Sequence, residues 1–285
     1  MDLSAYLAPH GITLCGALAL RDCTVRRAHL LTREGLDPNR LDDLWVCIFA
    51  IPYLTPRPFS SQNVSDYAVC EDYHLFVKQL GKDVLPRLQR DFPSHRFCLF
   101  ADHSPIDEIE AAERAGLGVR GKNHLLLTQE YSSYVFLGEI VTDLVLSPTG
   151  HSEPPRRLCE GCDACLAVCP MQMEGGPCRS ALTQKKSPLT DEETRMLSSL
   201  ESVWGCDACQ QVCPYTVRAR QAGTIYTPIP FFRQHLLPCL TTAQLDAMDE
   251  QSFARRAYAW RGRQTIRRNL LLHEQANDTQ GKEES

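Results

Sequence analysis

Two short runs of cysteines constrain the fold of this chain more than any other feature of its sequence. The first run is Cys159-x2-Cys162-x2-Cys165-x3-Cys169-Pro170, and the second is Cys206-x2-Cys209-x3-Cys213-Pro214. The first has the spacing of bacterial ferredoxins, in which the fourth cysteine binds the neighbouring cluster. The second run has Val203 where its first cysteine would stand, and Cys178 is the nearest residue able to replace it.

The spacing therefore predicts two [4Fe–4S] clusters held by eight thiolates. Cluster one would take Cys159, Cys162, Cys165 and Cys213, and cluster two would take Cys206, Cys209, Cys169 and Cys178. Thiolates are soft, anionic donors that suit iron, and short spacings let one loop wrap a cluster. A pair of structural zinc sites is the alternative, since paired cysteines alone permit it. The two continuations that end in Cys-Pro favour iron and sulfur.

The chain has 14 cysteines, a number that would also suit a disulfide framework. Its N-terminus carries no basic export signal, so we expect a cytoplasmic protein with reduced thiols, and metal binding is the better interpretation. The six cysteines outside residues 159–213 need no cluster. Cys47 and Cys98 lie in apolar stretches and are expected to be small buried hydrophobes.

Composition and charge exclude several classes of protein. Apolar residues make up 43% of the 285 residues and charged residues 23%, which is ordinary for a folded chain. The net charge of −5 excludes a protein that is basic throughout, but it leaves room for a local basic patch. The longest apolar stretch, residues 45–54, is too short to span a bilayer, so no membrane partner is expected.

The pattern of apolar residues predicts an α/β domain in the first half of the chain. Apolar runs predict strands at 45–51, 96–100 and 135–146, and a helical stripe covers 66–88. The expected organisation is an α/β catalytic domain at 1–150, a two-cluster domain at 151–220, a helical extension at 221–272 and a disordered tail at 273–285.

Asp102 is a candidate proton donor, because it ends the second predicted strand just ahead of a helix. That helix is expected to begin with Ser104 as its N-cap and Pro105 as its first residue. Open α/β sheets bind ligands at such strand ends, and burial would raise the pKa of a carboxyl there. A capping or turn aspartate is the alternative, which the residues alone favour. The glycine-rich loop at 116–123 would let the backbone approach a bulky ligand closely.

A basic stretch at 252–272 contains no acidic residue. Tyr258 and Trp260 are interleaved with its arginines, which are Arg255, Arg256, Arg261, Arg263, Arg267 and Arg268. Arginine with aromatic side chains suits the phosphates and unstacked bases of RNA. A solvated helix face packed against acidic residues explains the stretch equally well.

Further motifs follow one another in a recognisable order between residues 30 and 272. They are Asp72-Tyr73-His74, Asp102-x-x-Pro105, Arg114-Ala115-Gly116-Leu117-Gly118, Gly121-Lys122-Asn123, Phe136-Leu137-Gly138-Glu139-Ile140, Trp204-Gly205-Cys206-Asp207 and, most loosely, Arg261-Gly262-Arg263. With the cysteine runs, this order resembles epoxyqueuosine reductases, the iron–sulfur and cobalamin enzymes of tRNA queuosine modification. Relative to that family the chain is expected to be a short form without the C-terminal helical-repeat region.

The resemblance implies a fold and an activity. It implies a reductive-dehalogenase-like, cobalamin-binding α/β domain and a ferredoxin-like domain with two [4Fe–4S] clusters. It further implies an oxidoreductase that reduces epoxyqueuosine to queuosine at the wobble position of tRNA, with electrons passing through the clusters to the cobalamin. The partners implied are the anticodon region of tRNA and a low-potential donor such as flavodoxin or ferredoxin.

The resemblance also implies roles for single residues. Asp102 falls on the general-acid position of the family, which favours a proton donor over a turn residue. Asp102, Asn123, Tyr134 and Asp207 are expected to lie near the cobalamin. Two other hypotheses stay open: a corrinoid-dependent reductase of another small molecule, and a non-catalytic electron-transfer or corrinoid-reactivating protein.

Overall fold

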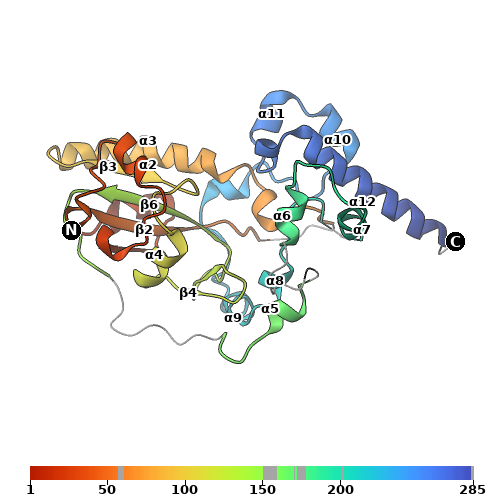
Figure 1. Ribbon diagram of the computed structural model, residues 1–285, viewed down its shortest axis with the longest axis horizontal. Helices are drawn as coiled ribbons and strands as arrows, with labels where there is room; N and C mark the ends of the chain where they lie inside the picture. The colour runs from red at the N-terminus through yellow and green to blue at the C-terminus, as the bar shows by residue number, and fades with distance from the viewer. Residues whose placement is uncertain (57–60, 150–158, 170, 172–177, 200–201, 284–285) are drawn as a thin grey trace. The chain divides into compact units, whose positions relative to one another are not determined.

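The computed structural model describes residues 1–56, 61–149, 159–169, 171, 178–199 and 202–283 (Figure 1). The chain divides into two compact units. Unit 1 holds Met1–Leu54, His74–Asp163 and Cys213–Pro230, and unit 2 holds Thr55–Tyr73, Ala164–Val212 and Phe231–Ser285. Because the chain passes repeatedly from one unit to the other, these units do not coincide with the consecutive segments predicted from the sequence. The predicted boundary at 150–151 lies outside the described residues.

Unit 1 is built on a four-stranded sheet with the strand order β1-β2-β6-β3. The strands are β1 Cys15–Ala19, β2 Trp45–Pro52, β3 Phe97–Phe100 and β6 Val135–Thr142. The long pair β2 and β6 runs from Trp45 opposite Thr142 to Pro52 opposite Val135. The apolar run of β2 is buried along almost its whole length, as expected for a strand covered on both faces. The three predicted strands are confirmed.

All three pairings in this sheet are antiparallel. The prediction of a mixed α/β fold is confirmed, but the rule that places ligands at the carboxyl ends of parallel strands does not apply to such a sheet. Asp102 follows β3, which is an edge strand. The position of Asp102 in the sheet therefore does not predict a ligand site, and only its own contacts can indicate one.

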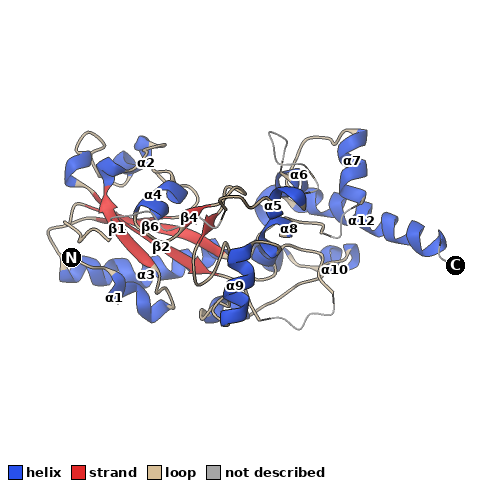
Figure 2. Cartoon of the chain, turned by 90° about the horizontal axis from the view of Figure 1, so that it is seen from below, coloured by secondary structure: helices blue, strands red, loops and turns tan. Residues whose placement is uncertain are grey.

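Helices cover both faces of the sheet. Figure 2 shows α3 (Tyr73–Asp91) on one face, and α2 (Ala28–Arg33) and α4 (Glu108–Arg114) on the other. The spacing at 66–88 is thus confirmed as helical from Tyr73 onward, and the helix continues through Pro86. The apolar side of α4, Ala111 and Ala112, is buried in the core beneath β1 and β2. As predicted, Cys47 and Cys98 are buried.

The start of α4 differs from the prediction. Asp107, not Ser104, is the N-cap, and its carboxylate accepts a hydrogen bond from the amide of Glu110 at 3.1 Å. The carbonyl of Pro105 accepts hydrogen bonds from the amides of Arg26 and Arg27. These tertiary bonds hold residues 104–106 in a bridge to another segment, so the helix begins three residues later than the local signals indicate.

A small hairpin and one helix complete the described part of unit 1 near its cysteines. The hairpin is β4 (Val119–Arg120) with β5 (Leu126–Leu127), and the helix is α9 (Pro214–Ala222). A Cβ atom on Gly118 would lie 2.4 Å from the carbonyl oxygen of Leu127. The close approach that this glycine permits therefore joins the two sides of the hairpin.

Unit 2 is helical in its described residues. Its α-helices are α5 Ala164–Ala167, α6 Arg179–Thr183, α7 Asp191–Ser198, α8 Ala208–Gln211, α10 Thr242–Ala247, α11 Glu250–Ala254 and α12 Arg263–Glu283. The core gathers Trp204, Tyr258, Ile266 and Leu270. No helix among the described residues has the length and apolarity needed to cross a membrane.

The predicted disordered tail at 273–285 is corrected in part, because α12 continues to Glu283. The carboxylate of Glu274 accepts hydrogen bonds from the amide and the hydroxyl of Thr242, at 2.9 and 2.8 Å. Since Ile266 and Leu270 already fix the start of α12 in the core, each further residue adds a backbone hydrogen bond at little cost.

Candidate functional site

Three of the predicted cluster-one ligands share a neighbourhood in unit 1. Cys213 is the N-cap of α9 and is only 6% exposed. It packs with Cys159 against Val119 and Leu127. Burial raises the pKa of Cys213, two backbone amide hydrogen bonds oppose that rise, and the charges of Cys159 and Cys162 add to it. The structure thus brings together cysteines of the two runs, as the predicted exchange of ligands requires.

The four predicted ligands of cluster two all lie in unit 2. Burial raises the pKa of Cys206, the backbone amide of Ala208 donates a hydrogen bond to its sulfur, and the charge of Cys178 acts on it. Cys178 is exposed and is the N-cap of α6, and Cys209 lies in α8. Cys178, predicted from its position in the sequence, therefore interacts electrostatically with Cys206 in the fold.

The donor set fits iron–sulfur clusters. All fourteen cysteines are free thiols in the structure, including all eight predicted cluster ligands. Backbone amides aimed at sulfur stabilise a thiolate, and they are found at Cys206 and Cys213. In the part of the chain that the structure describes, no three His, Cys, Asp or Glu side chains are placed to hold one metal ion.

Asp102 lies in a strained turn at the end of β3. Its φ of +61° is in the left-handed region, and the amide of His103 bonds the carbonyl of Ala101 across it at 2.6 Å. A three-residue turn with a positive central φ is rare for residues other than glycine. The Asp102 side chain is 74% exposed, and one of its oxygens lies 3.8 Å from Nε2 of His74. The carboxyl is thus presented outward, beside an imidazole.

Two further carboxyl groups lie behind Asp102. The amide of Asp102 donates to Oε1 of Glu108 at 3.1 Å. Burial raises the pKa of Glu108 to about 7, and the bond from Asp102 opposes that rise. Glu139, in the middle of β6, is 0% exposed, and burial followed by the charge of Glu108 raises its pKa well above the usual range. A buried, interacting pair of glutamates therefore supports the turn.

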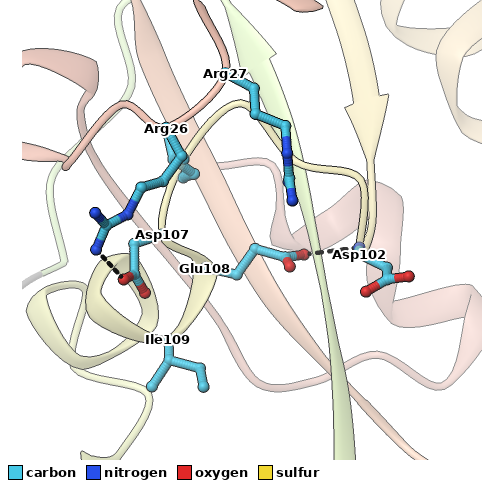
Figure 3. Close-up of a pocket in the computed structure, with 7 residues that line it drawn as sticks. Arg26, Arg27, Asp102, Asp107, Glu108 and Ile109 are labelled. Atoms are coloured by element: carbon cyan, nitrogen blue, oxygen red, sulfur yellow. Dashed lines mark hydrogen bonds and ion pairs between the residues drawn. The ribbon is translucent and has the colours of Figure 1, made fainter. Parts of the chain in front are cut away.

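Asp102 and Glu108 are among the residues that line a cavity of about 380 Å³ (Figure 3). Arg26 pairs with Asp107 at 3.1 Å on one side of it. Arg27 donates to the carbonyl of Ser104 at 3.1 Å, and its charge lowers the pKa of Glu108. The cavity thus combines two guanidinium groups with the carboxyls of Asp102 and Glu108, an arrangement suited to holding a polar ligand beside a proton donor.

The other three residues predicted to contact cobalamin have different surroundings. Asn123 is buried, and its Nδ2 atom has no hydrogen-bond partner among the described residues, so it has a donor to offer a ligand. Asp207 accepts from Ser65 and from the Asp66 amide, at 2.5 and 2.7 Å. Its carboxylate therefore ties the Cys206 loop to unit 2. Tyr134 is 0% exposed.

Tyr134 is a core residue in the part of the chain that the structure describes. Its ring packs edge-on against Tyr53 with 5.9 Å between centroids, and its carbonyl accepts the Tyr53 amide. Gly205, which precedes Cys206, has φ +73°, and a Cβ there would lie 2.4 Å from that of Ser65. Contacts with Tyr53 and Ser65 thus account for the position of the Tyr134 ring and for the glycine at 205.

Solved structures share this fold. A crystal structure of selenomethionine-labelled epoxyqueuosine reductase matches with a TM-score of 0.74 at 24% identity, over 95% of this chain and 80% of that one. A second, from Streptococcus thermophilus, matches with a TM-score of 0.72 at 22% identity, over 96% and 80%. A third, solved with an epoxyqueuosine-modified tRNA stem loop, has a TM-score of 0.73 at 24% identity, over 95% and 79%.

Sequence relatives decide the family. Epoxyqueuosine reductase of Listeria monocytogenes is 34% identical over 211 residues, covering 70% of this chain and 54% of that protein. The Alicycliphilus denitrificans enzyme is 33% identical over 187 residues, covering 66% and 50%. The chain belongs to the epoxyqueuosine reductase family. It spans about half the length of these curated relatives, and no family model matches it.

The basic stretch at 252–272 was predicted either to suit RNA or to be a solvated helix face packed against acidic residues. Most of its arginines have partners within unit 2. The hydrogen-bonded pairs are Arg255 with Glu71, Arg256 with the carbonyls of His235 and Val69, Arg263 with Glu250, Arg267 with Asp246 and Arg268 with the carbonyl of Lys185. The packed-helix interpretation therefore accounts for most of the stretch.

Arg261 is different, because its guanidinium lies 3.8 Å from the centre of the Trp260 ring. Trp260 is 58% exposed, which is unusual for so large an aromatic side chain. A stacked pair of this kind offers both a flat surface and a positive charge. It is the part of the basic stretch that suits an unpaired base.

Replacing Arg255 by Met should destabilise unit 2 by about 1–3 kcal/mol at pH 7, because the Glu71 carboxylate is 9% exposed and would lose its bidentate partner. Arg255 lowers the pKa of Glu71, so this stabilisation is present above pH ~4.5 and is lost as the pH falls through the lowered value. Urea unfolding of the wild type and the variant, at pH 7 and at acid pH, measures the loss of stability and its dependence on pH. An equal difference at the two pH values would contradict this account.

Sequence reasoning missed three members of this site: His74, Glu108 and Glu139. In the sequence His74 is only part of the motif Asp72-Tyr73-His74, whereas its neighbour in the fold is Asp102. Glu108 and Glu139 come from α4 and from the middle of a strand. An ionisable residue inside the apolar run of β6 was the signal available for Glu139, because such a residue needs a reason to be buried.

Proposed function

We propose that the protein reduces epoxyqueuosine in tRNA to queuosine, as an oxidoreductase with two [4Fe–4S] clusters and a cobalamin. The observation that carries this proposal is the fold shared with epoxyqueuosine reductases over 95% of the chain, in a protein that has seven cysteines in two ferredoxin-type runs and an eighth, Cys178, between them. Because tRNA is the proposed substrate, the proposed site of action is the cytoplasm.

The residues proposed to hold the clusters are those assigned by the cysteine spacing. Cluster one would be held by Cys159, Cys162, Cys165 and Cys213, and cluster two by Cys206, Cys209, Cys169 and Cys178. The approach of Cys159 to Cys213 and of Cys178 to Cys206 supports this pairing. When bound, the clusters supply single electrons and the cobalamin supplies the reducing centre for the epoxide. A flavodoxin or ferredoxin is the proposed electron donor.

Asn123 is the residue best suited to contact the cobalamin, since its buried Nδ2 donor lacks a partner among the described residues. Amide and carbonyl groups at the edge of a corrin could accept this hydrogen bond. Asp207 and Tyr134 serve unit 2 and the core of unit 1 respectively, so neither is proposed as a direct contact.

Asp102 is proposed as the general acid. Opening an epoxide leaves an alkoxide, which departs slowly at neutral pH unless a positioned acid protonates it. The Asp102 carboxyl is exposed at the rim of a polar cavity and lies beside His74. His74 can orient the Asp102 carboxyl, and Arg27, which also lines the cavity, can hold an anionic or polar part of the substrate.

The direct test is reduction of epoxyqueuosine by the whole protein. Protein reconstituted anaerobically with iron, sulfide and cobalamin is incubated with a chemical reductant and with tRNA from a strain that lacks the reductase. Nucleosides are then quantified by mass spectrometry. Epoxyqueuosine should fall and queuosine should rise equally, and omission of cobalamin should prevent both. Unchanged epoxyqueuosine with fully loaded protein would refute the proposal.

Replacing Trp260 by Ala should weaken binding of an anticodon stem-loop by about 1–3 kcal/mol, the range for one stacked base. Fluorescence anisotropy at fixed salt concentration gives the dissociation constant. The matched control is Arg267→Gln, because the exposed ion pair of Arg267 with Asp246 leaves little charge for RNA. Equal losses in the two variants would show a general charge effect, and no loss at Trp260 would remove it from the interface.

A further inference from the structure

The turn at Asp102 has a backbone conformation that needs a stabilising contact. Its left-handed backbone and the short bond from the His103 amide to the Ala101 carbonyl place Asp102 in a conformation that residues other than glycine avoid. Such a conformation persists only where the surrounding structure fixes it. The contact that does so is the hydrogen bond from the Asp102 amide to Oε1 of Glu108, at 3.1 Å (Figure 3).

Glu108 is itself poorly placed to be a simple solvated carboxylate. It lies at the start of α4, and its carboxyl faces the cavity wall between Asp102 and Arg27 (Figure 3). Burial raises its pKa to about 7, whereas the Asp102 amide and the Arg27 charge favour the ionised form. Small changes in its surroundings therefore decide whether Glu108 carries a negative charge near neutral pH.

Glu139 is the other group that influences whether Glu108 carries a negative charge. Glu139 belongs to β6, where it stands opposite Ile48 and Phe100 in the sheet, and it is 0% exposed. Neither of its carboxyl oxygens meets a well-aligned hydrogen-bond partner in the described residues, although Glu108 and Ser104 lie near enough to change its pKa. Two neighbouring carboxyls in such a setting keep one proton between them.

We propose that Glu108 is a positioning residue for Asp102: its carboxyl accepts the hydrogen bond of the Asp102 amide and so holds the left-handed turn. The charged and titratable groups around Glu108 are Arg27, Asp102 and Glu139, from three different segments. Glu108 thereby presents the Asp102 carboxyl to the cavity. This inference rests on the proposed acid role of Asp102 for its consequence, but not for its structural test.

The structural test is amide hydrogen exchange of the segment around Asp102 in protein without substrate. Glu108→Ala removes the acceptor and should increase exchange at Asp102 by tenfold or more, whereas Glu108→Gln, which keeps an amide oxygen, should restore most of the protection. Glu139→Gln mimics the protonated group and should behave as wild type. The matched control is Glu110→Ala on the same helix, whose partner is Arg114.

The catalytic test compares the same variants in the reductase assay. Glu108→Ala should lower kcat by about 10²-fold with little change in KM, as expected for a displaced acid, and Glu108→Gln should recover most of the loss. Unchanged exchange at Asp102 in Glu108→Ala would overturn the inference, whatever the activity. Increased exchange in that variant, together with an inactive wild type, would retain the positioning role and refute the proposed reaction instead.

A second readout reports the protonation of Glu108. In wild-type protein labelled with 13C at glutamate carboxyls, one resonance should titrate near pH 7, and this resonance should be missing from Glu108→Gln. Glu139→Leu removes a neighbouring carboxyl that lowers the pKa of Glu108, so the same resonance should move to higher pH. If every glutamate titrated in its ordinary acid range, Glu108 would not be buried behind Asp102 and the proposal would be wrong.

Discussion

Replacing Asp102 by Asn should lower turnover of epoxyqueuosine-containing tRNA by about 10²–10⁴-fold, the range that a positioned general acid supplies. Asn has the same shape and keeps the backbone turn, but it has no acidic proton to give to the departing oxygen. Iron content and thermal stability should stay as in wild type, because the Asp102 side chain is 74% exposed. The loss should therefore appear in kcat.

The control for this experiment is Asp83→Asn. Asp83 is an exposed aspartate of α3 that accepts a hydrogen bond from Gln79, far in sequence from the cavity. Its replacement makes the same chemical change and should leave turnover intact. If Asp102→Asn kept more than about a tenth of the wild-type rate, Asp102 would be a turn residue and the proton would have to come from elsewhere.

Replacing Cys213 by Ser should remove one cluster and abolish reduction. Iron should fall from about eight to about four atoms per chain, since a [4Fe–4S] cluster needs all four thiolates. Cys213 is also buried beside Val119 and Leu127, but Ser is smaller than Cys and should cost little in folding. The control is Cys239→Ser, outside both runs, which should keep all the iron.

Double variants test which cysteines share a cluster. Cys178→Ser and Cys206→Ser should each remove about four irons, and the two together should remove no more, because both ligands belong to cluster two. Combining Cys178→Ser with Cys213→Ser should remove all the iron. Additive losses in the first pair would mean that the assignment of Cys178 is wrong. Stoichiometric zinc in wild-type protein would exclude the clusters altogether.

The family was predictable from sequence because its evidence is local. Cysteine spacing, Cys-Pro pairs and short motifs such as Gly121-Lys122-Asn123 can be read without knowing how the chain folds. Long apolar runs located β2, β3 and β6 for the same reason. In contrast, the N-cap of α4 was predicted at Ser104 but lies at Asp107, since tertiary hydrogen bonds to Pro105 outweigh the local capping signal.

The basic stretch shows the limit of such reasoning. Six arginines in a window without acids looked free to bind RNA, yet their partners are supplied from distant positions, such as Glu71 for Arg255. A charge pattern along the chain reports only neighbours in sequence. Whether an arginine is available depends on the carboxylates and carbonyls that the fold brings to it, and here only the stacked Arg261 and Trp260 stand apart.

The sequence alone determined the family, the mixed α/β class and the two sets of candidate cluster ligands, because spacing and periodicity are properties of short segments. Only the tertiary structure decided what surrounds Asp102. Its left-handed turn, the Glu108 acceptor, the buried Glu139 and the neighbouring His74 come from four separate segments. Burial and hydrogen bonding between such segments set the orientation and the protonation of carboxyl groups, and no pattern within one segment records them.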